Sequence, residues 1–161
     1  LFRSTQISGE ACNLKTETYL TNSPGIVPSL EVCTQLCEES SQCRSVTFYG
    51  SNWCSHFSST CSSTDRMPGA TVVRFQPRTY SASWALAGSY GSQCDFDNGE
   101  TYLAGSSGRS VSLSACLDSC EATSGCRSVV FYYSSKFCSH VSTACSKIIE
   151  TEGGAVAFTK A

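Results

Sequence analysis

The arrangement of its cysteines constrains this chain more than any other feature. The sequence has 161 residues and twelve cysteines, which fall into two sets of six. The first set is Cys12, Cys33, Cys37, Cys43, Cys54 and Cys61, and the second is Cys94, Cys116, Cys120, Cys126, Cys138 and Cys145. Successive intervals are 21, 4, 6, 11 and 7 residues in the first set and 22, 4, 6, 12 and 7 in the second. The sequence therefore predicts two copies of one disulfide-rich unit.

The even number of cysteines also indicates where the chain works. A unit of roughly 70 to 80 residues buries little core for its surface, and disulfides commonly supply the missing stability. Disulfides persist in oxidising compartments, so we expect a secreted or cell-surface, extracellular protein. If every cysteine is paired, no thiolate remains for zinc binding or nucleophilic catalysis. We therefore expect no metal and no cofactor.

Charge and hydropathy exclude two classes of partner. The formal net charge is −2, charged residues make up 15% of the chain, and no basic stripe is present, so nucleic acid is not an expected partner. No apolar run reaches the roughly 18–20 residues of a membrane-spanning helix. The surface is instead rich in serine and threonine, whose hydroxyls can carry O-linked glycans. We expect an extracellular glycoprotein with no transmembrane segment.

The repeat extends beyond the cysteines and sets the domain boundaries. The motif Glu-Thr-Tyr-Leu at residues 17–20 recurs at 100–103. We predict one domain at 1–75, including an N-terminal extension, and a second at 90–161. Residues 76–89 have no counterpart inside a unit and form the predicted linker. Their Tyr, Trp and Leu side chains make this segment too apolar for a free tether, so we expect it to lie against one domain or both.

Each unit has the pattern of a strand, a turn, a helix and a β-hairpin. In the first unit, residues 16–20 alternate as a strand does, and Pro24-Gly25 marks a turn. Ser29 has the character of a helix N-cap. The apolar residues that follow recur at helical spacing and predict one buried face. They are Leu30, Cys33, Leu36 and Cys37.

The second unit repeats this pattern. Ser112 is the predicted N-cap, and Gly125 the predicted stop of the helix. The predicted buried face consists of Leu113, Cys116, Leu117 and Cys120. Segments rich in β-branched and aromatic residues predict the strands. They are 44–49 with its hairpin partner 52–57, 127–133 with its partner 137–141, and the closing strands 72–75 and 155–158.

The order of cysteines and strands resembles that of the PAN/apple domain. The matching residues are Cys33-x3-Cys37-x5-Cys43, the aromatic strand after them and Cys54, and the second unit repeats all of these. The resemblance implies an α+β fold in which each domain is a twisted antiparallel sheet that cradles one helix. Tandem domains of this kind are similar to the microneme-type adhesins and lectins of apicomplexan parasites, some of which bind galactose.

The resemblance also implies a disulfide pairing and a function. Six cysteines allow fifteen connectivities, and the spacing alone does not choose among them. The family pattern pairs first with sixth, second with fifth and third with fourth cysteine. It gives Cys12–Cys61, Cys33–Cys54, Cys37–Cys43, Cys94–Cys145, Cys116–Cys138 and Cys120–Cys126. PAN/apple domains are non-catalytic and recognise proteins or carbohydrates.

A carbohydrate site needs an aromatic face for stacking and polar groups for hydroxyls. The hairpin of the second unit offers Tyr133 and Lys136, with His140 nearby in sequence and Asp95 or Asp97 as an acceptor. The first unit has a weaker equivalent in Trp53 and His56. The alternative for the hairpin is an ordinary solvated tip. The alternative for both histidines is a structural role, in which a backbone carbonyl satisfies the ring.

Two functions from different classes fit these features. The first is a non-catalytic adhesion or recognition module that binds galactose-type carbohydrate or an extracellular protein. The second is a self-assembling subunit of an O-glycosylated fibre or surface coat. Residues 1–8 motivate the second, because an apolar extension can add a strand to the sheet of a neighbour. The other interpretation of that extension is a frayed terminus. With two histidines and no phosphate-binding loop, the chain is not expected to be an enzyme.

Overall fold

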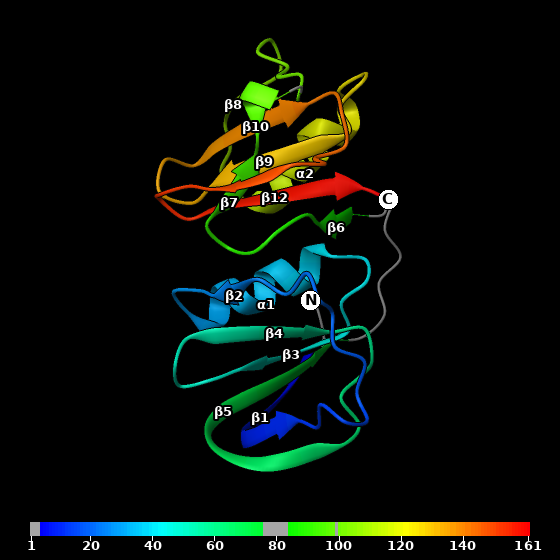
Figure 1. The fold of residues 1–161 in the computed structure, drawn as a ribbon, viewed down its shortest axis with the longest axis vertical. Helices are drawn as coiled ribbons and strands as arrows, with labels where there is room; N and C mark the ends of the chain where they lie inside the picture. The colour runs from blue at the N-terminus through cyan, green and yellow to red at the C-terminus, as the bar shows by residue number, and fades with distance from the viewer. Residues whose placement is uncertain (1–3, 76–83, 99) are drawn as a thin grey trace. The chain divides into compact units, whose positions relative to one another are not determined.

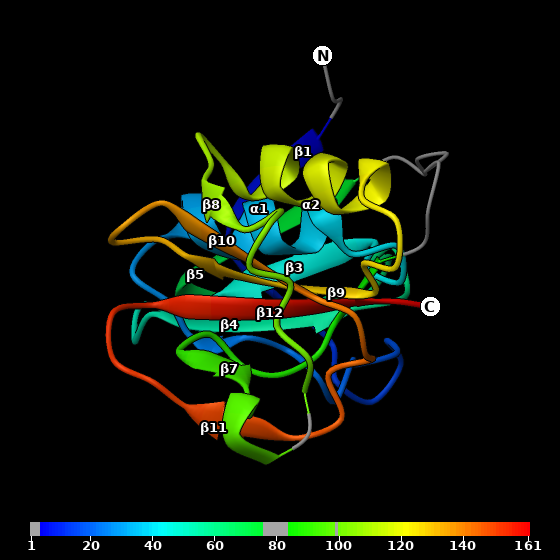
Figure 2. The same ribbon diagram turned by 90° about the horizontal axis from the view of Figure 1, so that it is seen from above.

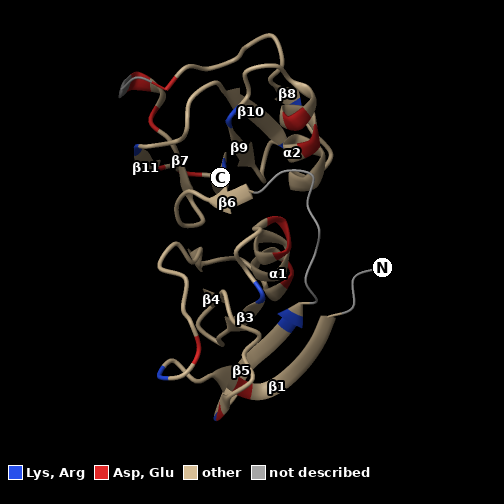
Figure 3. Ribbon diagram, turned by 90° about the vertical axis from the view of Figure 1, so that its right-hand side faces the viewer, with Lys and Arg blue, Asp and Glu red and all other residues tan. Residues whose placement is uncertain are grey.

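The computed structural model describes residues 4–75, 84–98 and 100–161, which belong to two compact units, Leu1–Ser81 and Ala82–Ala161 (Figure 1). No helix in the described part of the chain is long and apolar enough to cross a membrane. Lysines and arginines are scattered over both units and do not form a basic stripe among the residues described (Figure 3).

In the first unit, the described residues form a five-stranded antiparallel sheet with one helix on its face. The strand order is β1-β5-β3-β4-β2. The elements are β1 (Ser4–Cys12), β2 (Gly25–Ile26), α1 (Leu30–Glu39), β3 (Ser45–Phe48), β4 (Trp53–Phe57) and β5 (Thr64–Phe75). A disulfide from Cys33 of α1 to Cys54 of β4 ties the helix to the sheet.

In the second unit, the described residues repeat this sheet in the order β6-β12-β9-β10-β8 and add the two-stranded pair β7-β11. Figure 2 shows α2 on one side of the sheet and the β7–β11 pair on the other. The elements are β6 (Trp84–Leu86), β7 (Ser92–Cys94), the 3-10 helix η1 (Phe96–Asn98), β8 (Gly108–Arg109), α2 (Leu113–Ala122), β9 (Ser128–Tyr132), β10 (Phe137–Val141), β11 (Ile148–Glu150) and β12 (Ala155–Lys160).

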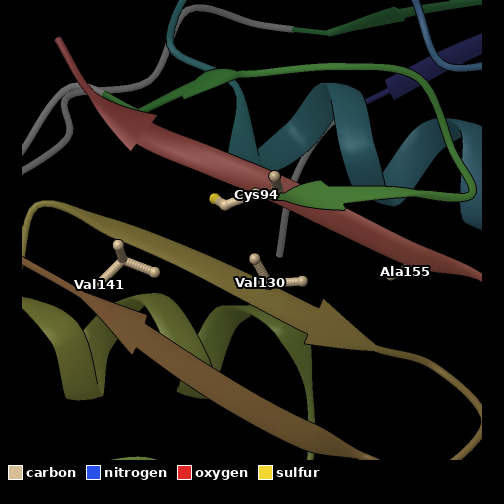
Figure 4. Close-up of a cluster of buried hydrophobic side chains, with 5 residues drawn as sticks. Cys94, Val130, Val141 and Ala155 are labelled. Atoms are coloured by element: carbon tan, nitrogen blue, oxygen red, sulfur yellow. The ribbon is translucent and has the colours of Figure 1, made fainter. Parts of the chain in front are cut away.

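The cores lie between each helix and its sheet and on the far side of the sheet around the first-to-sixth disulfide. In the second unit, Cys94 packs with Val130, Val141, Ala155 and Ala157 (Figure 4). In the first unit, Cys12 and Cys61 pack with Phe57 and Val72. The burial of apolar side chains and the disulfides together hold these small units.

Both helices begin where the sequence predicts. The backbone N–H of Val32 donates to Ser29 Oγ at 3.3 Å, and that of Ala115 donates to Ser112 Oγ at 3.1 Å. These bonds satisfy N–H groups that have no partner inside the helix. The predicted helix faces are buried except for Leu30, which is half-buried. Helix α2 ends at Ala122, and Gly125 lies in the turn beyond it with φ 79°.

The six disulfides join the cysteines that the family pattern implies. They are Cys12–Cys61, Cys33–Cys54, Cys37–Cys43, Cys94–Cys145, Cys116–Cys138 and Cys120–Cys126. No described cysteine is free. The α+β fold of two disulfide-stapled domains is confirmed, as are the hairpins β3–β4 and β9–β10. The first closing strand is longer than predicted, because β5 begins at Thr64.

The predicted strand at residues 16–20 is wrong. The Asn13 side-chain oxygen accepts from the Lys15 N–H at 2.9 Å, and the Asn13 carbonyl accepts from the Glu17 N–H at 2.9 Å. This turn bends the segment, because an asparagine offers the backbone local partners that compete with strand pairing. Only Tyr19 pairs, in an isolated bridge with Phe57.

The predicted turn at Pro24-Gly25 is also misplaced. The turn lies at Thr21 and Asn22, and Gly25 already belongs to β2, where it pairs with Cys54. Gly25 has φ 76°, a backbone conformation that favours glycine.

The N-terminal extension pairs within its own unit. From Ser4 onward it forms β1, which pairs antiparallel with β5. From Ser4 onward it is therefore not a frayed terminus, and β1 is an edge strand of the sheet; residues 1–3 lie outside the described part. Of the predicted linker at 76–89, residues 76–83 also lie outside the described part. Trp84–Leu86 form β6, which pairs with β12.

Candidate functional site

The first unit has a hollow on the sheet face opposite its helix. Successive side chains of a strand point to opposite faces. In β4, Cys54 is disulfide-bonded to α1, so its neighbours Trp53 and Ser55 point away from the helix. The hollow has a volume of about 390 Å³. We call it the aromatic hollow; its lining residues are Leu14, Tyr19, Tyr49, Trp53 and Ser55.

The rings of this hollow stand on a paired backbone and are open to solvent. Tyr19 packs edge-on against Phe57, with ring centroids 5.8 Å apart. The Tyr49 N–H donates to the Trp53 carbonyl at 2.9 Å, which closes the hairpin between β3 and β4. Trp53 is 44% exposed and Tyr19 is 38% exposed. Flat apolar surface is thus left partly uncovered within this unit.

A second, more polar hollow adjoins the first and shares Leu14 and Tyr49 with it. Its volume is about 250 Å³, and it also contacts Asn13, Lys15 and Asp65. The Asn13 side-chain amide donates to Asp65 Oδ1 at 3.3 Å. Aromatic faces therefore lie next to a carboxylate, an amide and an ammonium group, which together can stack on a ring and bind hydroxyls.

The structure does not bring His56 to Trp53. His56 points toward α1, is 1% exposed, and its Nε2 lies 3.1 Å from the Cys33 carbonyl oxygen. Burial lowers the pKa of His56 to about 4, although the Cys33 carbonyl raises it in part. His56 is therefore a neutral ring between sheet and helix, away from the aromatic hollow.

His140 occupies the same place in the second unit. It is fully buried, and its Nδ1 lies 2.9 Å from Ser106 Oγ. Burial lowers the pKa of His140, the Cys116 carbonyl raises it, and the positive charge of Lys160 lowers it further. Its ring is not available to a ligand in solution.

Lys136 and Tyr133 do lie together, but the other predicted partners do not join them. Lys136 Nζ is 5.6 Å from the centroid of the Tyr133 ring and 5.8 Å from that of Phe131. Tyr133 in turn packs against Phe131 and Tyr90, with centroids 5.1 and 5.7 Å away. The Tyr133 ring therefore already has three partners within the unit, while Lys136 remains exposed.

The two candidate acceptors lie elsewhere. Asp97 is exposed in η1, and Asp95 is buried and accepts a hydrogen bond from the Asp97 N–H at 3.2 Å. Phe96 anchors this segment on the core cluster opposite α2. Phe131, under Lys136, pairs across the strands with Cys138, which points toward α2. The acidic and basic groups thus lie on opposite faces of the sheet.

Two groups have the residue types of a metal site. Cys33, Cys54 and His56 lie together, as do Cys116, Cys138 and His140. The cysteines in both groups are disulfide-bonded to each other. A disulfide sulfur lacks the thiolate charge that binds zinc, so these groups are structural.

A pair of equivalent carboxylates was not predicted from the sequence. Glu17 accepts hydrogen bonds from the hydroxyls of Ser59 and Ser62 and from the Ser63 N–H. Glu100 accepts from the Thr143 hydroxyl and from the N–H and hydroxyl of Ser146. Each therefore fixes the loop that carries the sixth cysteine of its unit. The sequence signal for these carboxylates was that both glutamates recur as the first residue of the Glu-Thr-Tyr-Leu motif.

The hollow itself was also missed, apart from Trp53. Tyr19 was visible only as part of the repeated motif, and Tyr49 was assigned to a strand. Nothing in the sequence singles out Leu14, because it reaches the hollow through the turn that Asn13 forms.

The fold and its cysteine pattern agree with a known family. The PAN domain model matches residues 9–81 and again 94–156. The chain belongs to the PAN domain family. No curated protein matches it, so the similarity to apicomplexan adhesins gains no support. PAN domains are non-catalytic modules of extracellular adhesion and recognition. Together with six disulfides, this fits a secreted or extracellular protein.

Proposed function

We propose that this tandem PAN protein binds carbohydrate through the aromatic hollow of its first domain. The observation that carries the proposal is the exposure of Trp53, at 44%, inside a preformed hollow rather than in a core. Exposed aromatic rings cost free energy in water, and a ligand that covers them recovers it. The proposed role is extracellular recognition without catalysis, by a secreted or cell-surface protein.

The chemistry of the hollow suits a sugar ring. One face of a pyranose carries C–H groups that pack on aromatic rings, and its edge carries hydroxyls. Trp53, Tyr19 and Tyr49 supply the rings, and Asp65 and Asn13 supply polar groups beside them. The volume of about 390 Å³ lies in the range of small-ligand pockets. A galactose-type sugar is the first candidate, because its C–H groups gather on one face.

The experiment is a glycan array with three matched proteins. The parent is compared with Trp53→Ala and with Phe137→Ala, which changes the equivalent position in the second domain. We expect the Trp53 variant to bind at least tenfold more weakly and the Phe137 variant to bind like the parent. Equal binding by the parent and Trp53→Ala, or a larger loss in Phe137→Ala, overturns the proposal. Denaturant unfolding of each variant controls for stability.

A second candidate, self-assembly into an O-glycosylated fibre or coat, has one specific observation in its favour. Ile26 is 65% exposed, pairs across the strands with Trp53, and extends the apolar surface beside the hollow. A second copy of the chain could cover that surface. The N-terminal extension gives weaker support for self-assembly, because β1 from Ser4 onward is already paired with β5.

Electron microscopy and size-exclusion chromatography separate the two candidates. Polymers that disappear in Ile26→Ser support self-assembly, whereas a monodisperse parent contradicts it. The intact mass of native material shows whether hexoses are attached. A glycan-binding monomer supports the first proposal alone.

A further inference from the structure

The sheet of the first domain ends on a long strand that has a partner on one side only. Within the described residues, the two five-stranded sheets end on β1 and β2 in the first domain and on β6 and β8 in the second. β2 and β8 have two residues each and β6 has three, whereas β1 has nine. A short edge strand offers little backbone to another chain, whereas a long one can accept a further strand. Of these four edges, β1 is therefore the best suited to strand addition.

The neighbouring strands show which way the backbone of β1 faces. In an antiparallel sheet, the N–H and C=O groups of successive residues point to alternate sides of the strand. The Phe75 N–H of β5 donates to the Arg44 carbonyl at 2.9 Å, on the side of β3. The adjacent residue, Arg74, therefore faces β1, where its partner is Thr5. The N–H and C=O groups of Thr5 are thus directed to β5.

The same alternation assigns the rest of the strand. Ile7 lies two residues beyond Thr5 and also faces β5. The N–H and C=O groups of Ser4, Gln6 and Ser8 point to the opposite side. In the part of the chain that the structure describes, β1 pairs with no strand on that side. Three residues of β1 therefore present donors and acceptors to a further strand.

The side chains of this edge do not oppose a partner. Natural edge strands commonly carry lysine, proline or a bulge that prevents pairing with another chain. From Ser4 to Ser8 the chain has no charged residue and no proline. Ile7 is half-buried, and the other four residues of this stretch are exposed. The register shift between β1 and β5 comes only after Ser8, so Ser4–Ser8 is a regular and unprotected edge.

This stretch is complementary to itself. An antiparallel copy centred on Gln6 places Gln6 opposite Gln6 of the second copy, Thr5 opposite Ile7 and Ser4 opposite Ser8. The outward backbone groups of the two copies then meet in hydrogen-bonded pairs. Glutamine side chains can hydrogen-bond each other, and β-branched pairs and hydroxyl pairs are favourable cross-strand neighbours. A shift by one residue would set outward groups against inward ones, so this register uses the whole regular edge.

We propose that two copies of this chain pair through β1, antiparallel and about a two-fold axis at Gln6, so that their first-domain sheets become one. Both copies use the same surface in such a contact, so it closes at two copies and does not build a fibre. The pair does not depend on sugar binding, because β1 supplies none of the residues that line the aromatic hollow.

Charge complementation at Gln6 tests the pair. In Gln6→Lys two ammonium groups meet across the axis, and in Gln6→Glu two carboxylates meet, whereas an equimolar mixture brings one of each together. Gln6 is exposed, so folding should tolerate both changes. The matched control for added charge is Val111→Lys, at a position that is 87% exposed in the second domain. Sedimentation equilibrium of the full chain measures association in each sample.

We expect the parent to dimerise with a dissociation constant of about 10–100 μM, at the weak end for a small contact. Each Gln6 variant alone should associate at least about tenfold more weakly, because like charges lie opposite each other. Their mixture should associate within about threefold of the parent, and Val111→Lys should behave like the parent. A parent that is monomeric at about 1 mM, or a mixture that stays monomeric, overturns the proposal. Association lost in Ile26→Ser but kept in Gln6→Lys does the same.

Amide hydrogen exchange gives a second readout at single residues. The N–H groups of Thr5 and Ile7 face β5 in each copy, so they should be protected at every protein concentration. The Gln6 N–H should exchange freely in dilute samples and become protected as the pair forms. If the parent associates while the exchange of Gln6 stays constant, the copies meet through another surface and the proposal is wrong.

Discussion

The two domains share one buried scaffold and differ at several exposed positions. Each has a serine-capped helix, three disulfides in the same connectivity, and a buried histidine beneath the helix. Their exposed faces diverge, with Trp53 open in the first domain and Phe96 turned inward in the second. The repeated residues therefore account for the common scaffold, and the proposed binding surface of the first domain differs from the second domain at Leu14 and Trp53.

The carboxylates Glu17 and Glu100 belong to the repeated part. Hydrogen bonds from Ser59 and Ser63 lower the pKa of Glu17 and outweigh its burial. Burial raises the pKa of Glu100, but its hydrogen bonds from Thr143 and Ser146 hold it below its ordinary value. Both domains thus use one charged group to fasten the same loop.

The largest expected effect tests whether the scaffolds are equivalent. The first-to-sixth disulfides close loops of 49 and 51 residues, so each is expected to stabilise its own domain by about 4 kcal/mol in the chain-entropy account. Replacing Cys12 and Cys61 by alanine should destabilise only the first domain, and the Cys94 and Cys145 pair only the second. Urea unfolding followed residue by residue measures this. If the losses of unfolding free energy in the two domains differ by more than about 1 kcal/mol, the two scaffolds are not equivalent.

The next effect concerns the buried histidines. The pKa of His56 is about 4 in the folded chain and about 6.5 in an unfolded one. As pH falls through this window the unfolded state binds the proton first, so stability present above pH 6.5 is lost toward pH 4. The expected loss is about 3 kcal/mol. His140 should act in the same direction in the second domain.

Urea unfolding between pH 7 and 4 measures the histidine effect. His56→Gln should flatten the dependence of unfolding free energy on pH in the first domain and leave that dependence unchanged in the second. A profile unchanged by this substitution would show that His56 does not stay neutral in the folded state.

A smaller effect is expected for the paired carboxylates. Glu17→Gln and Glu100→Gln should each cost about 2 kcal/mol at pH 7, because a charged acceptor of several hydrogen bonds is lost. The lowered pKa values make this stability present above about pH 4.3, the unfolded value, and lost as pH falls below it. Thermal unfolding at pH 7 and pH 3 checks the prediction, with a smaller gap between parent and variant at pH 3 than at pH 7. A gap that is as large at pH 3 as at pH 7 contradicts it.

The smallest effect separates the two candidate sugar surfaces. Lys136 is exposed and stacks over Phe131 and Tyr133, so Lys136→Ala should cost about 0.5 kcal/mol. Sugar binding should change less than twofold. A tenfold loss of binding, measured by nuclear magnetic resonance titration with methyl β-galactoside, would move the site to the second-domain hairpin that the sequence favours.

The sequence was sufficient for several local features, although the strand expected at 16–20 and the turn expected at Pro24-Gly25 were wrong. Helix caps, hairpins and the cysteine pairing implied by the family pattern follow from short motifs. The β1–β5 pairing joins residues more than 50 apart, as at Cys12 and Thr64, and no local pattern encodes it. The hollow was missed for the same reason, because the turn at Leu14 and the hairpin at Trp53 that line it lie far apart in the sequence. The separation of Trp53 from His56 was predictable, because strand residues three apart point to opposite faces.

The two tryptophans give the most direct test of recognition by the first domain. Trp53 is 44% exposed in the aromatic hollow, and Trp84 is 2% exposed in the second domain, where its indole N–H donates to Glu121 Oε1 at 2.9 Å. Their indole N–H signals can be followed separately while methyl β-galactoside, or the best glycan of an array, is titrated. The account predicts that the Trp53 signal shifts with saturation and the Trp84 signal stays. Saturable binding that leaves Trp53 unmoved would contradict it.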